Sequence, residues 1–119
     1  MISGMYSAEF ISSRGAGGTG IAIFSSGTIH GGDTSFYYRG KFKLDEQNRI
    51  SGTIEVIKHS NLFNSVFGPL ERFKLILNGL VQNEGFTLLG QIDGEPTEAI
   101  TIVLKKIDDL VDDLEVTRG

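Results

Sequence analysis

Residues able to carry chemistry are few in this chain, and their spacing matches no common catalytic pattern. There is no cysteine, and the only histidines are His30 and His59. A metal site would need further ligands from scattered carboxylates, so we interpret both histidines as surface or turn residues. Asp33 has no carboxylate or base adjoining it, and we expect it to accept hydrogen bonds from backbone N–H groups of its own turn. The sequence therefore predicts no catalytic residue, metal or cofactor, with catalysis by Asp33 or His30 as the weakest alternative.

Three glycines, Gly15, Gly17 and Gly20, match the G-x-G-x-x-G spacing of a dinucleotide-binding loop. Such a loop must open a helix whose first N–H groups hold the pyrophosphate, but the residues that follow are IAIF, a β-branched sequence. No acidic residue lies near Gly40, where a ribose-binding carboxylate is expected. We interpret residues 12–20 as a hairpin loop rather than a nucleotide site.

The charge distribution argues against binding to DNA. Five of the fifteen acidic residues lie in 108–119, so residues 1–107 are neutral, with ten acidic and ten basic side chains. Binding to DNA usually relies on clustered Lys and Arg that displace counterions from phosphates. Arg39, Lys41 and Lys43 lie on one predicted strand face with Tyr37, and this face could contact nucleic acid or an acidic protein. A solvated face that deters edge pairing is the favoured interpretation.

The chain lacks the sequence features of export or membrane insertion. Its first residues carry neither a basic region nor an apolar run, and no apolar stretch approaches the roughly 20 residues that span a bilayer. The absence of cysteine fits a reducing compartment. We therefore expect a soluble, unprocessed, cytoplasmic protein without membrane contact.

Alternation of apolar and polar residues indicates strands along most of the chain. It is clearest over 35–44, where the even positions are apolar or glycine and the odd positions are mainly polar or charged. The strand over 50–56 repeats this parity, and pairing the two places Phe42 opposite Gly52. Small residues opposite large ones are typical of a narrow closed sheet.

The chain as a whole reads as mainly β, with short turns between strands and one change of period. Over 60–69 the apolar residues fit a helical face, with Ser60 as N-cap and Gly68-Pro69 as a stop signal, which predicts one short helix. We predict a single antiparallel up-and-down barrel of about eight strands over 1–107, followed by an acidic C-terminal tail over 108–119. A sheet with open edges is the alternative. The predicted strands cover 5–12, 20–24, 28–30, 35–44, 50–56, 73–77, 86–92 and 100–104.

Aromatic side chains are expected to point into this barrel. They could surround a small apolar ligand, or they could fill an interior as narrow as that of eight strands. The residues expected to line such a cavity are Phe36, Tyr38, Phe42, Phe73 and Phe86.

A set of glycine, aromatic and aliphatic positions carries a resemblance to a known family. They are Met5-Tyr6-Ser7, Gly20, Gly27, Ile29, Gly31-Gly32-Asp33, Tyr38, Gly40, Phe73, Leu75, Leu77, Gly79, Phe86, Leu88 and Gly90. Together they resemble the GrlR family, negative regulators of type III secretion gene expression in enteric pathogens. The resemblance implies a lipocalin-like barrel, a homodimer, and a protein that binds a transcriptional activator and keeps it from DNA. Gly31, Gly32 and Asp33, its most specific part, are interpreted as a structural corner.

The loop after the aromatic strand differs from the family pattern. In the type member an acidic Glu-Asp-Glu-Asp loop carries the partner contact, whereas the matching residues here are Asp45, Glu46, Gln47 and Asn48, with half the charge. Fewer carboxylates weaken charge-assisted recognition of a basic helix, so the partner need not be the same. The leading hypothesis is a non-enzymatic regulator that binds its partner through this loop, and the alternative is a carrier or sensor of small apolar ligands.

Overall fold

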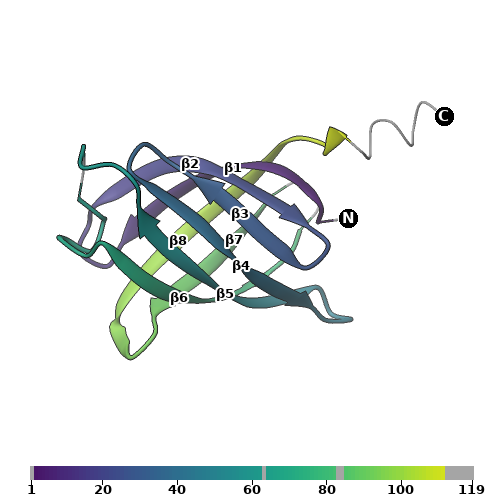
Figure 1. The fold of residues 1–119 in the computed structure, drawn as a ribbon. Helices are drawn as coiled ribbons and strands as arrows, with labels where there is room; N and C mark the ends of the chain where they lie inside the picture. The colour runs from purple at the N-terminus through teal and green to yellow at the C-terminus, as the bar shows by residue number, and fades with distance from the viewer. Residues whose placement is uncertain (1, 63, 83–84, 112–119) are drawn as a thin grey trace.

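Eight antiparallel strands close into a barrel in the computed structural model, which describes residues 2–62, 64–82 and 85–111 (Figure 1). Each strand pairs with the next, and β8 pairs with β1 to close the sheet. The strands are β1 (Gly4–Ser12), β2 (Gly17–Ser25), β3 (Thr28–Gly32), β4 (Phe36–Leu44), β5 (Arg49–Lys58), β6 (Arg72–Leu80), β7 (Gly85–Ile92) and β8 (Glu95–Asp108). The predicted up-and-down barrel is confirmed, and the alternative of a sheet with open edges is wrong.

The predicted register between β4 and β5 is also confirmed. Phe42 pairs with Gly52, and Gly40 pairs with Ile54. A Cβ added at Gly40 would lie 2.7 Å from the Cα of Ile54, closer than side chains tolerate. Glycine at this position therefore lets the two strands approach where the barrel wall bends.

The short helix predicted over 60–69 is wrong, because the described residues of this segment form turns and bends. The hydroxyl of Ser65 donates to the carbonyl of Gly68 (2.9 Å) and accepts from the N–H of Phe67 (3.1 Å), which closes a tight turn. Phe67 is buried, and its ring lies edge-on to Phe73 at 5.5 Å. Burial of one ring in the barrel stabilises this turn more than a helical stripe of so few residues would. Phe63, also assigned to that stripe, lies outside the described residues.

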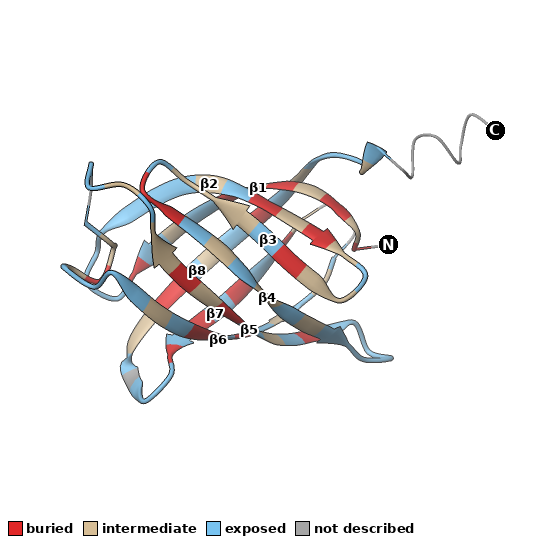
Figure 2. Cartoon of the chain, viewed as in Figure 1, coloured by how far each residue is buried: buried red, intermediate tan, exposed pale blue. Residues whose placement is uncertain are grey.

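Burial alternates along most strands, as expected for a barrel with one face inside (Figure 2). In β7, for example, every second residue from Phe86 to Ile92 is buried. No helix within the described residues is long and apolar enough to cross a membrane. Of the predicted acidic tail, Asp108 still belongs to β8, and residues 112–119 lie outside the described part of the chain.

The up-and-down topology sorts the connections between the two ends of the barrel. The β1–β2, β3–β4, β5–β6 and β7–β8 connections lie at one end, which we call the hollow end. The β2–β3, β4–β5 and β6–β7 connections lie at the other, the packed end, together with the N-terminus (Figure 1). These two ends differ in what fills them.

Candidate functional site

A cavity of about 350 Å³ occupies the barrel interior at the hollow end. All eight strands contribute to its lining, as do residues 33–35 of the β3–β4 corner and 64–66 of the β5–β6 loop. Most of the lining is apolar, with Leu75, Leu77 and Leu88 among the buried side chains. A volume of this size is at the lower end of the range for small-molecule pockets in proteins.

Small residues on β2 make room for neighbouring side chains of the cavity wall. The inward positions in the first part of that strand are Gly18, Gly20 and Ala22, and the register places Ala8 of β1 beside Gly20. Larger side chains lie against these glycines, since a Cβ added at Gly18 would lie 2.9 Å from the Phe10 ring and one added at Gly20 would lie 3.1 Å from the Tyr38 hydroxyl. Sequence reasoning looked for aromatic lining residues and missed these small ones.

Four aromatic rings close the floor of the cavity towards the packed end. Phe24 lies edge-on to Tyr6, Phe42 and Phe86, with ring centroids 5.2, 5.5 and 5.7 Å apart respectively. Tyr6 also contacts Phe86 at 5.4 Å, and its buried hydroxyl donates to the carbonyl of Ile2 at 2.7 Å. Edge-to-face packing of this kind is the favoured arrangement of aromatic rings, and these four rings occupy the interior beneath the cavity.

The aromatic residues expected to line a cavity divide between these two regions. Phe36, Tyr38 and Phe73 line the cavity, and the rings of Phe36 and Phe73 lie 6.5 Å apart. Phe42 and Phe86 are not part of its lining, because they pack beneath it against Phe24. The sequence placed all five rings inside but could not assign them to an end of the barrel.

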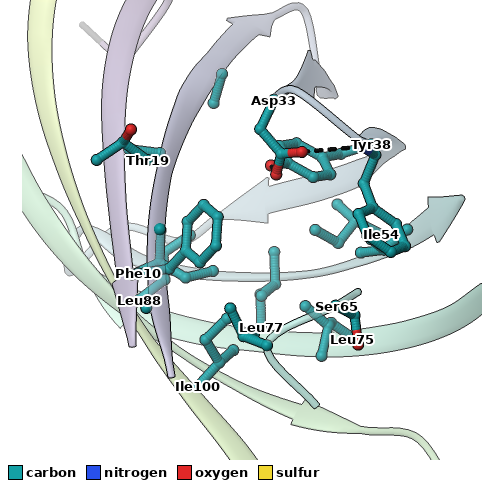
Figure 3. Close-up of a pocket in the computed structure, with 18 of the residues that line it drawn as sticks. Phe10, Thr19, Asp33, Tyr38, Ile54, Ser65, Leu75, Leu77, Leu88 and Ile100 are labelled. Carbon is teal, nitrogen blue, oxygen red and sulfur yellow. Dashed lines mark hydrogen bonds between the residues drawn. The ribbon is translucent and has the colours of Figure 1, made fainter. Parts of the chain in front are cut away.

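Asp33 and Tyr38 form a polar pair in the cavity wall (Figure 3). One carboxylate oxygen of Asp33 accepts from the N–H groups of Ser35 (3.0 Å) and Phe36 (2.9 Å), so the carboxylate holds the corner as expected. The other oxygen accepts from the hydroxyl of Tyr38. Burial, and next the hydrogen bond to Asp33, raise the pKa of Tyr38, so its hydroxyl stays protonated and remains a donor.

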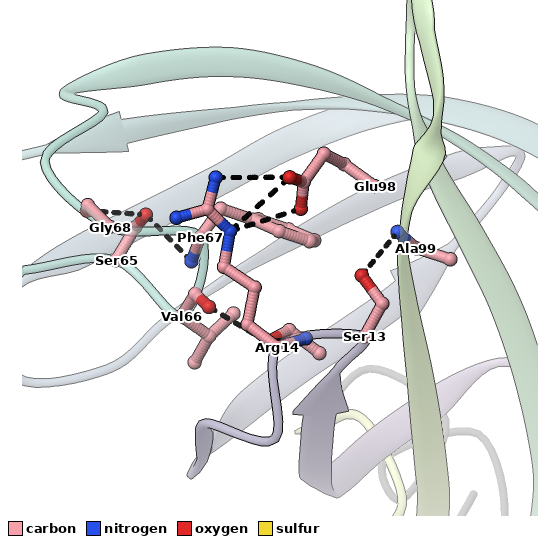
Figure 4. A network of polar contacts seen from close by, with 9 residues as sticks. Ser13, Arg14, Ser65, Val66, Phe67, Gly68, Glu98 and Ala99 are labelled. Atoms are coloured by element: carbon pink, nitrogen blue, oxygen red, sulfur yellow. Dashed lines mark hydrogen bonds and ion pairs between the residues drawn. The ribbon is translucent and has the colours of Figure 1, made fainter.

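Polar contacts at the hollow end hold the β5–β6 loop beside the cavity (Figure 4). The buried hydroxyl of Ser12 donates to the carbonyl of Val66 at 2.7 Å. Next to it, Arg14 contacts both carboxylate oxygens of Glu98 at 3.0–3.2 Å, which ties the β1–β2 turn to β8. The loop residue Val66 is thereby fixed as part of the cavity lining.

The two histidines have different surroundings. His30 is exposed on β3, and its register partner on β4 is Arg39. His59 is exposed, and its Nε2 lies 3.1 Å from the carbonyl oxygen of Asp33. Among the described residues no group of three potential metal-ligating side chains comes together.

Two glycines of the G-x-G-x-x-G pattern and the basic residues of the predicted strand face belong to regular strands of the barrel. Gly17 and Gly20 belong to β2, which pairs with β1 instead of opening a helix. Arg39 forms an ion pair with Glu55 at 3.4 Å, while Lys41 and Lys43 are exposed on the outer face of β4. Tyr37 is exposed on the same face.

The loop over 45–48, expected to bind a partner, forms the β4–β5 turn at the packed end, opposite the cavity. Asp45 accepts from the N–H groups of Gln47 and Arg49 at 2.9 Å and pairs with the Arg49 side chain at 2.8 Å. The hydrogen bond from the backbone of Arg49 is the main cause of a lowered pKa for Asp45, with further contributions from its side chain and Gln47. Asn48 has a φ of 63°, as the turn requires, and Glu46 is exposed. Asp45 therefore holds the turn, and Glu46 presents its charge to solvent.

Two comparisons with known proteins bear on the identity of this chain. No family model matches this chain, and a search of curated proteins finds no match. The resemblance to the GrlR family stays a prediction.

Proposed function

We propose that this protein is a non-enzymatic, cytoplasmic regulator of the GrlR type, which acts as a homodimer and sequesters a protein partner such as a transcriptional activator. The observation that supports it best is the structural role of the motif residues in a barrel of the implied kind. A Cβ on Gly31 would collide with the carbonyl of Ile21, and the Asp33 carboxylate holds the β3–β4 corner. Two of the positions that resemble the family are therefore positions that this fold needs.

The β4–β5 turn is the proposed partner contact. The hydrogen bonds of Asp45 make the turn rigid, so Glu46 is presented at low entropic cost to a basic surface. The Arg49 side chain offsets the charge of Asp45, which leaves Glu46 as the carboxylate available for a partner. This gives the turn a weaker acidic character than its sequence indicates.

The test is affinity capture from the source organism with the wild-type protein and with the variant Glu46→Ala. We expect a DNA-binding protein among the captured proteins, at a several-fold lower yield with Glu46→Ala. Asp93→Ala is the matched control, because Asp93 is an exposed turn carboxylate at the hollow end. Equal capture by Glu46→Ala and wild type would contradict the proposed contact. Release of the captured protein from its DNA by the purified barrel then tests sequestration directly.

The cavity favours a second function, the binding of a small apolar ligand. Binding of decanol, followed by chemical shifts of methyl groups in the cavity, tests it. Ala22→Leu places a larger side chain into the cavity and should abolish binding, whereas Thr53→Leu adds a leucine to the outer face of β5 and should not. Binding that survives Ala22→Leu would place the ligand elsewhere.

A further inference from the structure

One charged side chain, that of Asp33, belongs to the described residues that line the cavity. The other polar lining residues are neutral, and no Lys, Arg or His is among them. An acid entering this cavity would meet a carboxylate without any cation to offset the repulsion. A neutral or cationic ligand would meet no such penalty.

The charge of Asp33 is stabilised by hydrogen bonds but not offset by a cation. Its three donors are two backbone N–H groups and the Tyr38 hydroxyl, all of them neutral. None of the ion pairs in the described part of the chain includes Asp33. A carboxylate has about four lone-pair sites, so three donors leave it able to accept one more hydrogen bond. The Tyr38 oxygen keeps acceptor capacity as well.

The apolar remainder of the cavity faces this pair. Figure 3 shows Asp33 and Tyr38 at one side of the cavity and Phe10, Leu77 and Ile100 at the other. The Gly20 backbone adjoins the pair, since a Cβ there would lie 3.1 Å from the Tyr38 hydroxyl. A ligand with one polar head and an apolar body would match this distribution.

We propose that the cavity binds a small apolar amine whose protonated amino group donates to Asp33 and Tyr38, with its hydrocarbon body against the leucine-rich wall. The inference rests on the ligand-binding function proposed above. A volume of about 350 Å³ holds roughly a dozen non-hydrogen atoms, taking about 30 Å³ for each, the share of one water molecule in the liquid. A charge-assisted hydrogen bond in a partly enclosed apolar cavity is stronger than the same contact at the surface.

A matched series of decylamine, decanol and decanoate tests the proposal at pH 7 by calorimetric titration, because the three share one hydrocarbon chain. We expect the wild-type protein to bind decylamine at least tenfold more tightly than decanol, and decanoate most weakly. Asp33→Asn keeps an oxygen for the backbone N–H groups but removes the charge, and should bring decylamine and decanol to similar affinities. Ala22→Leu should abolish all binding, which separates the cavity from attraction to the acidic surface.

Each outcome either supports or overturns the proposal. If decanol or decanoate binds wild type as tightly as decylamine, the amine preference is wrong while ligand binding stands. If none of the three binds, the ligand-binding function fails too. The comparison of the three ligands on wild type decides the matter even if Asp33→Asn does not fold.

Discussion

The two ends of the barrel are built from the same strands but are stabilised by different forces. At the packed end, four aromatic rings meet edge to face, with Phe24 buried among the other three. At the hollow end, β2 contributes glycine and alanine, and hydrogen bonds hold the corner and the long loop around a cavity. The comparison teaches that a regular alternation of inward residues fixes a barrel, while the sizes of those residues decide whether it is filled.

One connection at the hollow end is much longer than the others. Two residues, Ser26 and Gly27, join β2 to β3 at the packed end, and Gly27 has the positive φ that such a tight turn needs. The β5–β6 loop at the hollow end runs from residue 59 to residue 71 and folds against the barrel through Phe67. This long loop and the three-residue β3–β4 corner both supply lining residues to the cavity.

The largest effect is expected at the packed end, from Phe24→Ala. Loss of a fully buried ring with three aromatic neighbours should lower the free energy of unfolding by about 3–5 kcal/mol, as measured in urea. The matched change at the hollow end is Phe10→Ala, which should cost at most about 2 kcal/mol because Phe10 is only partly buried and borders existing space. Equal losses would contradict the division between packed and hollow ends.

The next effect concerns the polar pair of the hollow end. Tyr38→Phe removes the donor to the Asp33 carboxylate and should cost about 1.5–3 kcal/mol, because a hydrogen bond to a charged group is lost at a partly buried site. Urea unfolding measures it. Tyr37→Phe is the control, since Tyr37 is exposed on the outer face of β4. A negligible loss at Tyr38 would mean that the corner is held by the backbone hydrogen bonds of Asp33 alone.

A smaller and local effect is expected from Ser12→Ala. It leaves the carbonyl of Val66 without its buried donor and should cost about 1 kcal/mol. Hydrogen exchange should show faster exchange for loop amides such as that of Phe67, while amides of the packed end keep their protection. Ser13→Ala serves as the control, because Ser13 accepts from Ala99 at an exposed site. Uniform acceleration across the barrel would show that the loop does not open separately.

The strands and their register could be predicted from the sequence far better than the cavity inside the barrel. Parity of apolar residues gave the eight strands and the pairing of Phe42 with Gly52, because alternation and register are local properties of neighbouring strands. The prediction of a helix over 60–69 was wrong because a tertiary contact, the burial of Phe67, outweighs helical periodicity in so short a segment. The cavity depends on which inward residues meet at one height of the barrel, a relation that no single strand reveals.

The smallest effect is expected from removing the charge of Asp45 in the β4–β5 turn at the packed end. Because the pKa of Asp45 is lowered in the folded protein, its charge stabilises the fold at neutral pH, and this contribution is lost as the pH falls below about 4. Asp45→Ala should therefore be less stable than wild type at pH 7, with a difference that shrinks towards pH 3, as followed by urea unfolding. In an Arg49→Ala background the difference should be smaller at every pH above about 4, because the ion pair is already absent. A difference that persists unchanged at pH 3 would mean that the turn depends on its backbone shape and not on the charge of Asp45, so that the Arg14–Glu98 ion pair of the hollow end would have no counterpart in this turn.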